Sequence, residues 1–285
     1  MPEPNSLVRP SAIAGRWYPG NPATLRRDIE RYYDVAPARV SGGRVLGLVA
    51  PHAGYSYSGS TAGRAFAQAR GGDFRRVVLL GPLHRPVWGA PVSPFMIPRE
   101  TAYRTPLGDV EVDHAFLKAL GEGVPLAVVE GDEEHALEIE LPLLQVALGA
   151  FTFAPIMLGE RLAERGAAER GRQLSSALAL LVDERTLLVA STDLSHMENY
   201  DAVVRTDSRL VDLVAAFDVE GVEAALAAET AQACGATGLA VVLHACRALG
   251  AKGAEVLQYT TSGDVTGDRR PGVYTVGYMA VVIHR

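Results

Sequence analysis

The sequence contains very little cysteine. Cys234 and Cys246 are the only two in 285 residues, and no Cys-x-x-Cys pair occurs. A four-thiolate zinc site and a disulfide framework are therefore not predicted. Cys246 lies in an apolar stretch and is interpreted as a core residue. Cys234 lies in a glycine-flanked turn before an expected helix, where a thiol can approach a metal.

A long uninterrupted apolar run is also missing, as is an excess of positive charge. The most apolar stretch, residues 239–249, is interrupted by His244 and Arg247, and the first ten residues hold no apolar segment. Neither a membrane span nor a signal peptide is predicted, so we expect a cytoplasmic protein without a membrane partner. The net charge is −6, with acids and bases spread along the chain. Such a chain offers no basic surface, and nucleic acid is not an expected partner.

What the sequence does contain is an alternation of short apolar runs and helix-like segments. Hydrophobic residues make up 48% and charged residues 21%, a balance typical of a folded globular chain. The expected strands are residues 45–50, 77–80, 126–129, 151–158, 187–190, 256–259 and 273–283, and the expected helices are residues 22–33, 60–70, 113–120, 134–148, 161–182 and 236–249.

This alternation predicts an α/β fold with helices on both faces of a sheet that has parallel members. No repeat and no linker long enough to separate domains is visible, so residues 1–285 are expected to form a single three-layer αβα domain. The central sheet is expected to be mixed and largely parallel. The proline-rich residues 85–106 are expected to form a long excursion over the surface or over a site.

Four of the seven histidines follow expected strands within a few residues. They are His52, His84, His135 and His196. In open α/β sheets ligands bind at the carboxyl ends of the strands, so these side chains are expected at one edge of the sheet. Several imidazoles in one crevice favour a metal site, although a histidine in such a loop can equally form only local hydrogen bonds.

Acidic residues accompany two of these histidines. A helix starting near residue 134 would place His135 and Glu138 on one face, while Asp132 is interpreted as part of a charged first turn. Asp193 precedes His196 by three positions and could orient an imidazole, or it could be an ordinary turn aspartate. No P-loop and no dinucleotide-binding glycine motif occurs.

A set of motifs, taken together, resembles the Memo family, whose bacterial and archaeal members are also called AmmeMemoRadiSam system protein B. The motifs follow the family's order and run from Ala14 to the last expected strand; they are AGRWYPG, APHAGYSYSGS, GPLHR, TPLGD, DEEHALEIELP, STDLSH and the Cys234-Gly235 pair. The family's fold is similar to that of the class III, LigB-like extradiol dioxygenases, which are non-haem iron enzymes.

The resemblance implies a metal pocket of three histidines, with further functional side chains around it. The implied ligands are His52, His84 and His196, and the implied catalytic residues are His135, Asp193 and Cys234. The dioxygenases instead hold iron with two histidines and a carboxylate, so a third histidine would make the site more neutral and weakens the inference of ring cleavage. Arg85 stands where family members often have a second histidine.

Three functions remain open at this point. The first is a metal-dependent redox enzyme, dioxygenase-like in fold, with one iron or copper ion in preference to zinc, His135 as acid or base and Asp193 orienting a ligand. The second is a non-catalytic protein that binds a metal or a peptide and works with AMMECR1-like and radical-SAM proteins. A lesser alternative is a zinc hydrolase, because three histidines and a water would suffice. The pocket would take a small molecule or a peptide.

Overall fold

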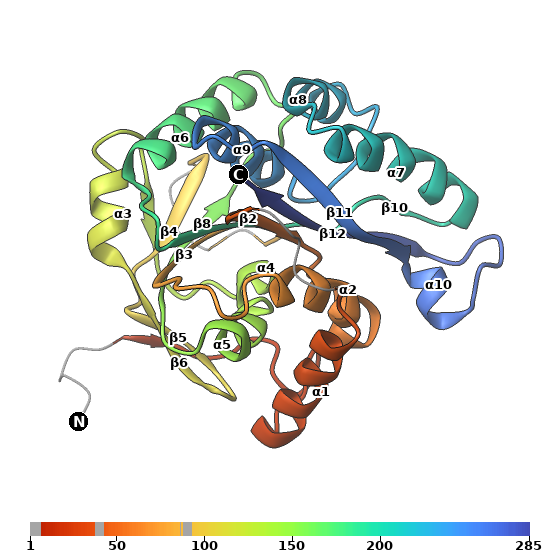
Figure 1. Cartoon of the computed structure of the whole chain (residues 1–285), viewed down its shortest axis with the longest axis horizontal. Helices are drawn as coiled ribbons and strands as arrows, with labels where there is room; N and C mark the ends of the chain where they lie inside the picture. Colours follow the sequence, from red (N-terminus) through yellow and green to blue (C-terminus); the bar gives the residue numbers. More distant parts are fainter. Residues whose placement is uncertain (1–6, 38–42, 86, 88–92) are drawn as a thin grey trace.

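The fold is a twisted central sheet between two layers of helices, as a computed structural model shows (Figure 1). The structure describes residues 7–37, 43–85, 87 and 93–285. Within these residues twelve strands form one sheet. The strands are β1 (Val8–Arg9), β2 (Val45–Ala50), β3 (Arg76–Pro82), β4 (Phe95–Pro98), β5 (Ala102–Thr105), β6 (Gly108–Val112), β7 (Ala127–Val129), β8 (Thr152–Leu158), β9 (Thr186–Ser191), β10 (His196–Met197), β11 (Gly253–Thr261) and β12 (Thr275–His284).

The centre of the sheet is parallel and its margins are mixed. Strands β6, β8, β3, β9 and β2 are neighbours in this order, and each adjacent pair is parallel. Strand β12 then pairs antiparallel with β2 and also with β11. Every residue of β2 and β9 is buried, which explains why both strands are continuous apolar runs instead of alternating patterns.

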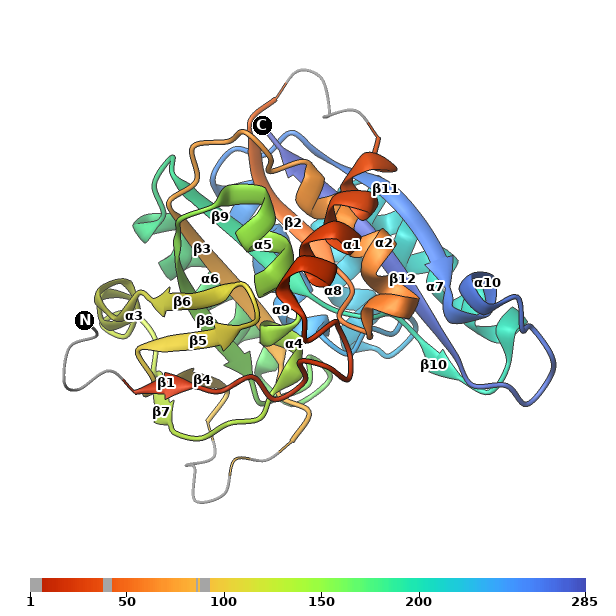
Figure 2. The same cartoon turned by 90° about the horizontal axis from the view of Figure 1, so that it is seen from below.

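The helices cover both faces of the sheet (Figures 1 and 2). One face carries α6, α7, α8 and α9, and the other carries α1, α2, α4 and α5. The helices are α1 (Pro22–Asp34), α2 (Tyr55–Ala67), α3 (His114–Leu120), α4 (His135–Glu138), α5 (Leu141–Leu148), α6 (Ala167–Leu181), α7 (Tyr200–Ala215), α8 (Val219–Ala227), α9 (Ala236–Ala248) and α10 (Ser262–Thr266). The predicted three-layer αβα fold with a mixed, largely parallel sheet is confirmed.

Three predicted segments differ in detail from the structure. The helix expected at residues 60–70 already begins at Tyr55, because the chain turns into α2 directly after Gly54. The helix expected at residues 134–148 is divided into α4 and α5, with Pro142 in the first turn of α5. The expected surface excursion at residues 85–106 is wrong for β4 and β5, which are paired in the sheet, while residues 86 and 88–92 lie outside the described residues.

Cys246 is fully buried in α9, which confirms its interpretation as a core residue. None of the helices in the described ranges combines the length and apolar character that crossing a membrane would require.

Candidate metal centre

Three neighbouring parallel strands bring functional side chains to one edge of the sheet. Strands β3, β9 and β2 lie side by side and end at Pro82, Ser191 and Ala50. His84 follows the first of these ends by two positions, and His52 follows the last by two. Because parallel strands end at the same edge, the loops after them converge, as the sequence analysis expected.

His135 reaches the same place by a different route. Strand β7 pairs parallel with β4, which is antiparallel to β8, so β7 runs against the central strands. Its carboxyl end is therefore not part of the edge where His52 and His84 lie. The chain instead turns at Gly131, with a positive φ of 71°, and enters α4, which packs on β3. His135 is the first residue of α4.

His52, His84 and His135 form a compact cluster. Each offers one ligand atom, and the three atoms lie within 4.8 Å of one another. The ring centroids of His84 and His135 are 4.5 Å apart with the rings stacked, and His52 stands edge-on to both, at 5.2 and 5.5 Å. His52 is 2% exposed, whereas the side chains of His84 and His135 are 31% and 16% exposed. The cluster could hold a metal ion.

The Nδ1 atom of each ring already faces a polar partner. His52 Nδ1 lies 2.9 Å from Ser191 Oγ, and His84 Nδ1 lies 2.9 Å from Glu134 Oε1. His135 Nδ1 lies 3.2 Å from the same carboxylate oxygen. Carboxylates and hydroxyls that hold one ring nitrogen fix the tautomer and orient the other nitrogen toward a metal. Nε2 is thus the nitrogen left for a ligand on all three rings.

Glu134 is the functional residue that sequence reasoning missed. It is 1% exposed, and besides the two rings it accepts the backbone N–H of His84 at 2.5 Å and of Ala136 at 2.8 Å. The second of these bonds caps α4, as an N-cap carboxylate does. Its position next to His135 in the sequence could have indicated a role in the site, but an acidic residue before a helix is ordinarily interpreted as a helix cap alone.

A buried ion network lies behind Glu134. Arg9, 1% exposed, donates to Asp132 Oδ1 at 3.1 Å and to Glu138 Oε2 at 2.7 Å. Asp132 in turn accepts the backbone N–H of Glu134 at 3.0 Å. The interpretation of Asp132 as part of a charged first turn is therefore wrong, because Asp132 precedes the N-cap of α4 and is a buried partner of Arg9. Glu138 also accepts the hydroxyls of Ser11 and Tyr18, so it braces the N-terminal segment.

Burial favours the neutral imidazoles that a metal needs. The pKa of His52 is lowered well below its ordinary value, first by burial and then by the like charges that His84 and His135 would carry. Burial also lowers the pKa of His135 to about 4, although the adjacent Glu134 opposes this. Both rings are therefore neutral near pH 7, the form in which imidazole binds metals.

Asp193 holds the backbone beneath the cluster. Its Oδ1 accepts the backbone N–H of His52 at 2.8 Å, and burial raises its pKa to about 7. Among the hydrogen bonds found for the described residues, none joins Asp193 to an imidazole ring, so the expected orientation of an imidazole by Asp193 stays a prediction. Its role in catalysis stays a prediction.

Cys234 contacts the cluster directly. Its Sγ lies 3.1 Å from His52 Nε2 and accepts the backbone N–H of Asp193 at 3.2 Å. Burial raises the pKa of the thiol, so the metal-free protein carries it protonated. The S–H group can donate to His52 Nε2 when the ring carries its proton on Nδ1.

His196 lies at the same cavity but outside the cluster. It lies in β10, opposite Val276 of β12, and the centroid of its ring is 6.1 Å from the ring centroid of Tyr274. Among the residues the structure describes, the histidine that joins His52 and His84 in the compact group is His135, not His196. The assignment of His196 as the third ligand stays a prediction.

The cluster opens into a cavity of about 620 Å³. Aromatic side chains form much of its wall, and the ring centroids of Trp17 and His135 lie 4.4 Å apart. Tyr57 lines the cavity, whereas Tyr55 is buried and donates its hydroxyl to Ile139 O. The lining residues are Arg16, Trp17, His52, Ala53, Gly54, Ser56, Tyr57, His84, His135, Asp193, His196, Ser262, Tyr274, Val276 and Tyr278.

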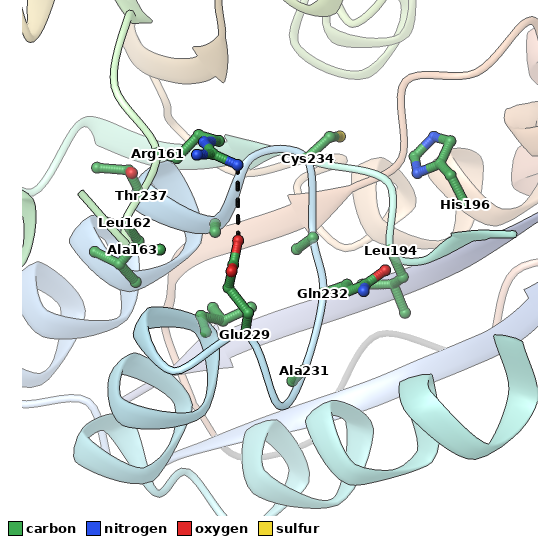
Figure 3. A pocket seen from close by; sticks show the side chains of 13 residues that line it. Arg161, Leu162, Ala163, Leu194, His196, Glu229, Ala231, Gln232, Cys234 and Thr237 are labelled. Carbon is green, nitrogen blue, oxygen red and sulfur yellow. Dashed lines mark ion pairs between the residues drawn. The ribbon is translucent and has the colours of Figure 1, made fainter. Parts of the chain in front are cut away.

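A second, smaller cavity adjoins the first. It has about 240 Å³ and lies between the loop at residues 161–163 and the segment 229–237, with Cys234 and His196 on its wall (Figure 3). Arg161 and Glu229 face each other across it, 3.7 Å apart. Both side chains are largely exposed, so this pair contributes little to stability.

Comparison with known proteins identifies close relatives over the whole length. A family model described as Memo-like protein matches residues 9–282. A MEMO1 family protein of Methanopyrus kandleri is 34% identical over 98% of this chain and 100% of its own length. MEMO1 family proteins of Methanosarcina acetivorans and Methanothermobacter thermautotrophicus are also 34% identical, over 97% and 95% of this chain and 99% of each relative.

Proposed function

Since the chain belongs to the family of Memo-like proteins, we propose that its histidine cluster binds one metal ion, iron or copper, and that the protein is a metal-dependent redox enzyme. The observation that carries the proposal is the meeting of His52, His84 and His135, with ligand atoms within 4.8 Å of one another. The substrate is a small molecule bound in the cavity of about 620 Å³, a size typical of small-molecule sites.

The donor set fits a metal of this class. Three imidazoles suit iron, copper and zinc alike, and each has its Nδ1 held by Ser191 or Glu134. The preference for iron or copper over zinc rests on the resemblance to the dioxygenase fold, because the thiol of Cys234 is a soft donor that suits zinc as well as copper and iron. A bound ion would supply one-electron redox chemistry and Lewis acidity.

Three side chains compete for the third ligand position beside His52 and His84. Geometry favours His135, the resemblance favours His196, and Cys234 lies within 3.1 Å of His52 Nε2. Metal content of the purified single variants His135→Ala, His196→Ala and Cys234→Ser separates them. We expect the His135 variant to lose most metal, and full retention in that variant would overturn this choice.

The protein's own side chains would bind the substrate and handle protons beside the metal. Trp17 and Tyr57 offer flat apolar walls for a bound molecule. If His196 carries the third ligand position, His135 is free to accept a proton from a substrate, since its pKa of about 4 keeps it unprotonated near pH 7. Arg16, which lines the cavity, can attract an anionic group.

The experiment that tests the enzyme is oxygen uptake by reconstituted protein. Protein purified without added metal is first analysed for its metal content. It is then loaded anaerobically with Fe(II) or Cu(I) and exposed to oxygen with a panel of diols, beside a His52→Ala control. We expect uptake that depends on the metal and on His52. Metal binding without uptake on any diol would refute the enzyme assignment for that class. Co-purification with AMMECR1-like or radical-SAM proteins would then favour the binding role.

A further inference from the structure

A buried carboxyl group lies behind the histidine cluster, with no cationic partner in the described part of the chain. Glu140, between α4 and α5, is fully buried. Its Oε1 lies 2.8 Å from Ser191 Oγ, and its Oε2 has no hydrogen-bond partner among the residues that the structure describes. None of the ion pairs within the described ranges involves Glu140. An ionised carboxylate in such a place would be very costly, so the protonation of this group needs an explanation.

The hydroxyl of Ser191 supplies that explanation. Ser191 Oγ has three close neighbours: the carbonyl of Ala136 at 2.7 Å, Glu140 Oε1 at 2.8 Å and His52 Nδ1 at 2.9 Å. A hydroxyl carries one hydrogen and two lone pairs. The carbonyl can only accept, so its contact with Ser191 is a hydrogen bond only if the hydroxyl hydrogen points to Ala136. The other two contacts are hydrogen bonds only if Glu140 and His52 both donate to Ser191.

We propose that Glu140 is a neutral carboxylic acid, and that it acts through Ser191 to fix His52 as the tautomer with its proton on Nδ1. Glu140 is then a positioning residue. It leaves the lone pair of His52 Nε2 directed to the metal centre before any metal arrives. The protonation states stand on the hydrogen-bond count alone, and only their consequence for metal binding rests on the proposed function.

The surroundings of Glu140 support a neutral form. Burial raises its pKa well above the ordinary value; the hydrogen bond with Ser191 opposes this shift, and the nearby carboxyl of Asp193 adds to it. Tyr33 and Tyr55, whose own pKa values are raised by burial, are the other titratable groups coupled to it. The hydroxyls of these tyrosines donate to the carbonyls of Leu143 and Ile139, so neither supplies a proton to Glu140.

Infrared difference spectroscopy on metal-free protein near pH 7 tests the protonation directly. Wild type minus Glu140→Gln should show the carbonyl band of a protonated carboxylic acid. The control Glu133→Gln removes an exposed carboxylate from the same segment and should show no such band. A Glu140 difference spectrum that holds only carboxylate bands would overturn the proposal.

The effect on His52 is tested by nitrogen NMR and by titration with Zn²⁺ as the probe. The side-chain amide introduced by Glu140→Gln still offers an N–H donor to Ser191, so this variant should keep His52 protonated on Nδ1 and its Zn²⁺ affinity close to wild type. Glu140→Leu and Ser191→Ala remove the interaction and should each weaken Zn²⁺ binding by about 10- to 100-fold, with mixed tautomers of His52. An Nε2-protonated His52 in the wild type would overturn the proposal.

Two further readouts keep these tests decisive. Circular dichroism checks that each variant is folded, and the isosteric Glu140→Gln variant carries the test if Glu140→Leu unfolds. A wild-type protein that binds no Zn²⁺ would count against the proposed function. The infrared and NMR results would still decide the protonation of Glu140 and His52, because both are recorded without metal.

Discussion

Replacing Glu134 by glutamine should weaken metal binding although it leaves all three histidines of the cluster in place. The carboxylate of Glu134 accepts from His84 Nδ1 at 2.9 Å, from the His84 backbone at 2.5 Å and from the Ala136 backbone at 2.8 Å. It also lies 3.2 Å from His135 Nδ1. One carboxylate therefore orients two of the three rings.

The magnitude follows from what an amide can accept. If the glutamine side chain places its NH₂ group at the Oε2 position, that group faces the backbone N–H of His84, donor against donor. If it places the NH₂ group at the Oε1 position, that group faces Ala136 and both rings. The orientation with the NH₂ group at the Oε2 position costs less. It loses one charge-assisted hydrogen bond, which is worth about 1.5–3 kcal/mol of folding free energy. Metal affinity should fall by about 10- to 100-fold, because the neutral carbonyl oxygen that then faces both rings is a weaker acceptor than the carboxylate and leaves the rings less basic.

The assay is a competition titration of metal-free protein with Zn²⁺ and a chelator, together with urea unfolding. Glu133→Gln is the matched control, because Glu133 is the preceding residue, is 75% exposed and, among the described residues, forms a single ion pair, with Arg85 at 3.9 Å. The control should bind Zn²⁺ as the wild type does. Equal affinities of Glu134→Gln and wild type would refute the claim that this carboxylate orients the rings.

Two further predictions concern stability. Arg9→Met leaves the buried charges of Asp132 and Glu138 unpaired and should lower the free energy of unfolding in urea by about 3–5 kcal/mol. The control Arg99→Met breaks an exposed ion pair and should change this free energy by at most about 1 kcal/mol. Equal losses in the two variants would contradict the prediction. Because the folded-state pKa of His135 lies below its unfolded value, metal-free protein should lose stability as the pH falls from about 6.5 to about 4. His135→Gln should show a smaller loss across that window in urea unfolding, and an unchanged loss would contradict the shift.

The edge of the sheet that carries the site was predictable from the sequence, because strand ends and histidines coincide. His52 and His84 follow β2 and β3 directly, and apolar runs of this kind identify buried parallel strands. The prediction that His135 lies at this edge was correct, but the strand-end argument behind it was only partly right. It follows a strand, but β7 runs against the central strands, and only the turn at Gly131 brings His135 back.

The internal arrangement of the site could not be predicted. Contacts between Glu134 and two rings, and between Ser191 and Glu140, join residues whose spacing carries no periodic signal. The exclusion of His196 from the compact group depends on where β10 pairs with β12, a tertiary detail. Strand and helix patterns place residues at an edge, whereas side-chain packing decides which of them touch.

Elemental analysis of the protein purified without added metal tests the central claim most directly. Wild type should contain about one iron or copper ion per chain, and the double variant His52→Ala, His84→Ala should contain almost none while remaining folded. The variant His114→Ala, whose ring bonds the carbonyl of Glu100 outside both cavities, should retain the metal of the wild type. Full metal occupancy in the double variant would contradict the assignment of this cluster as the metal centre.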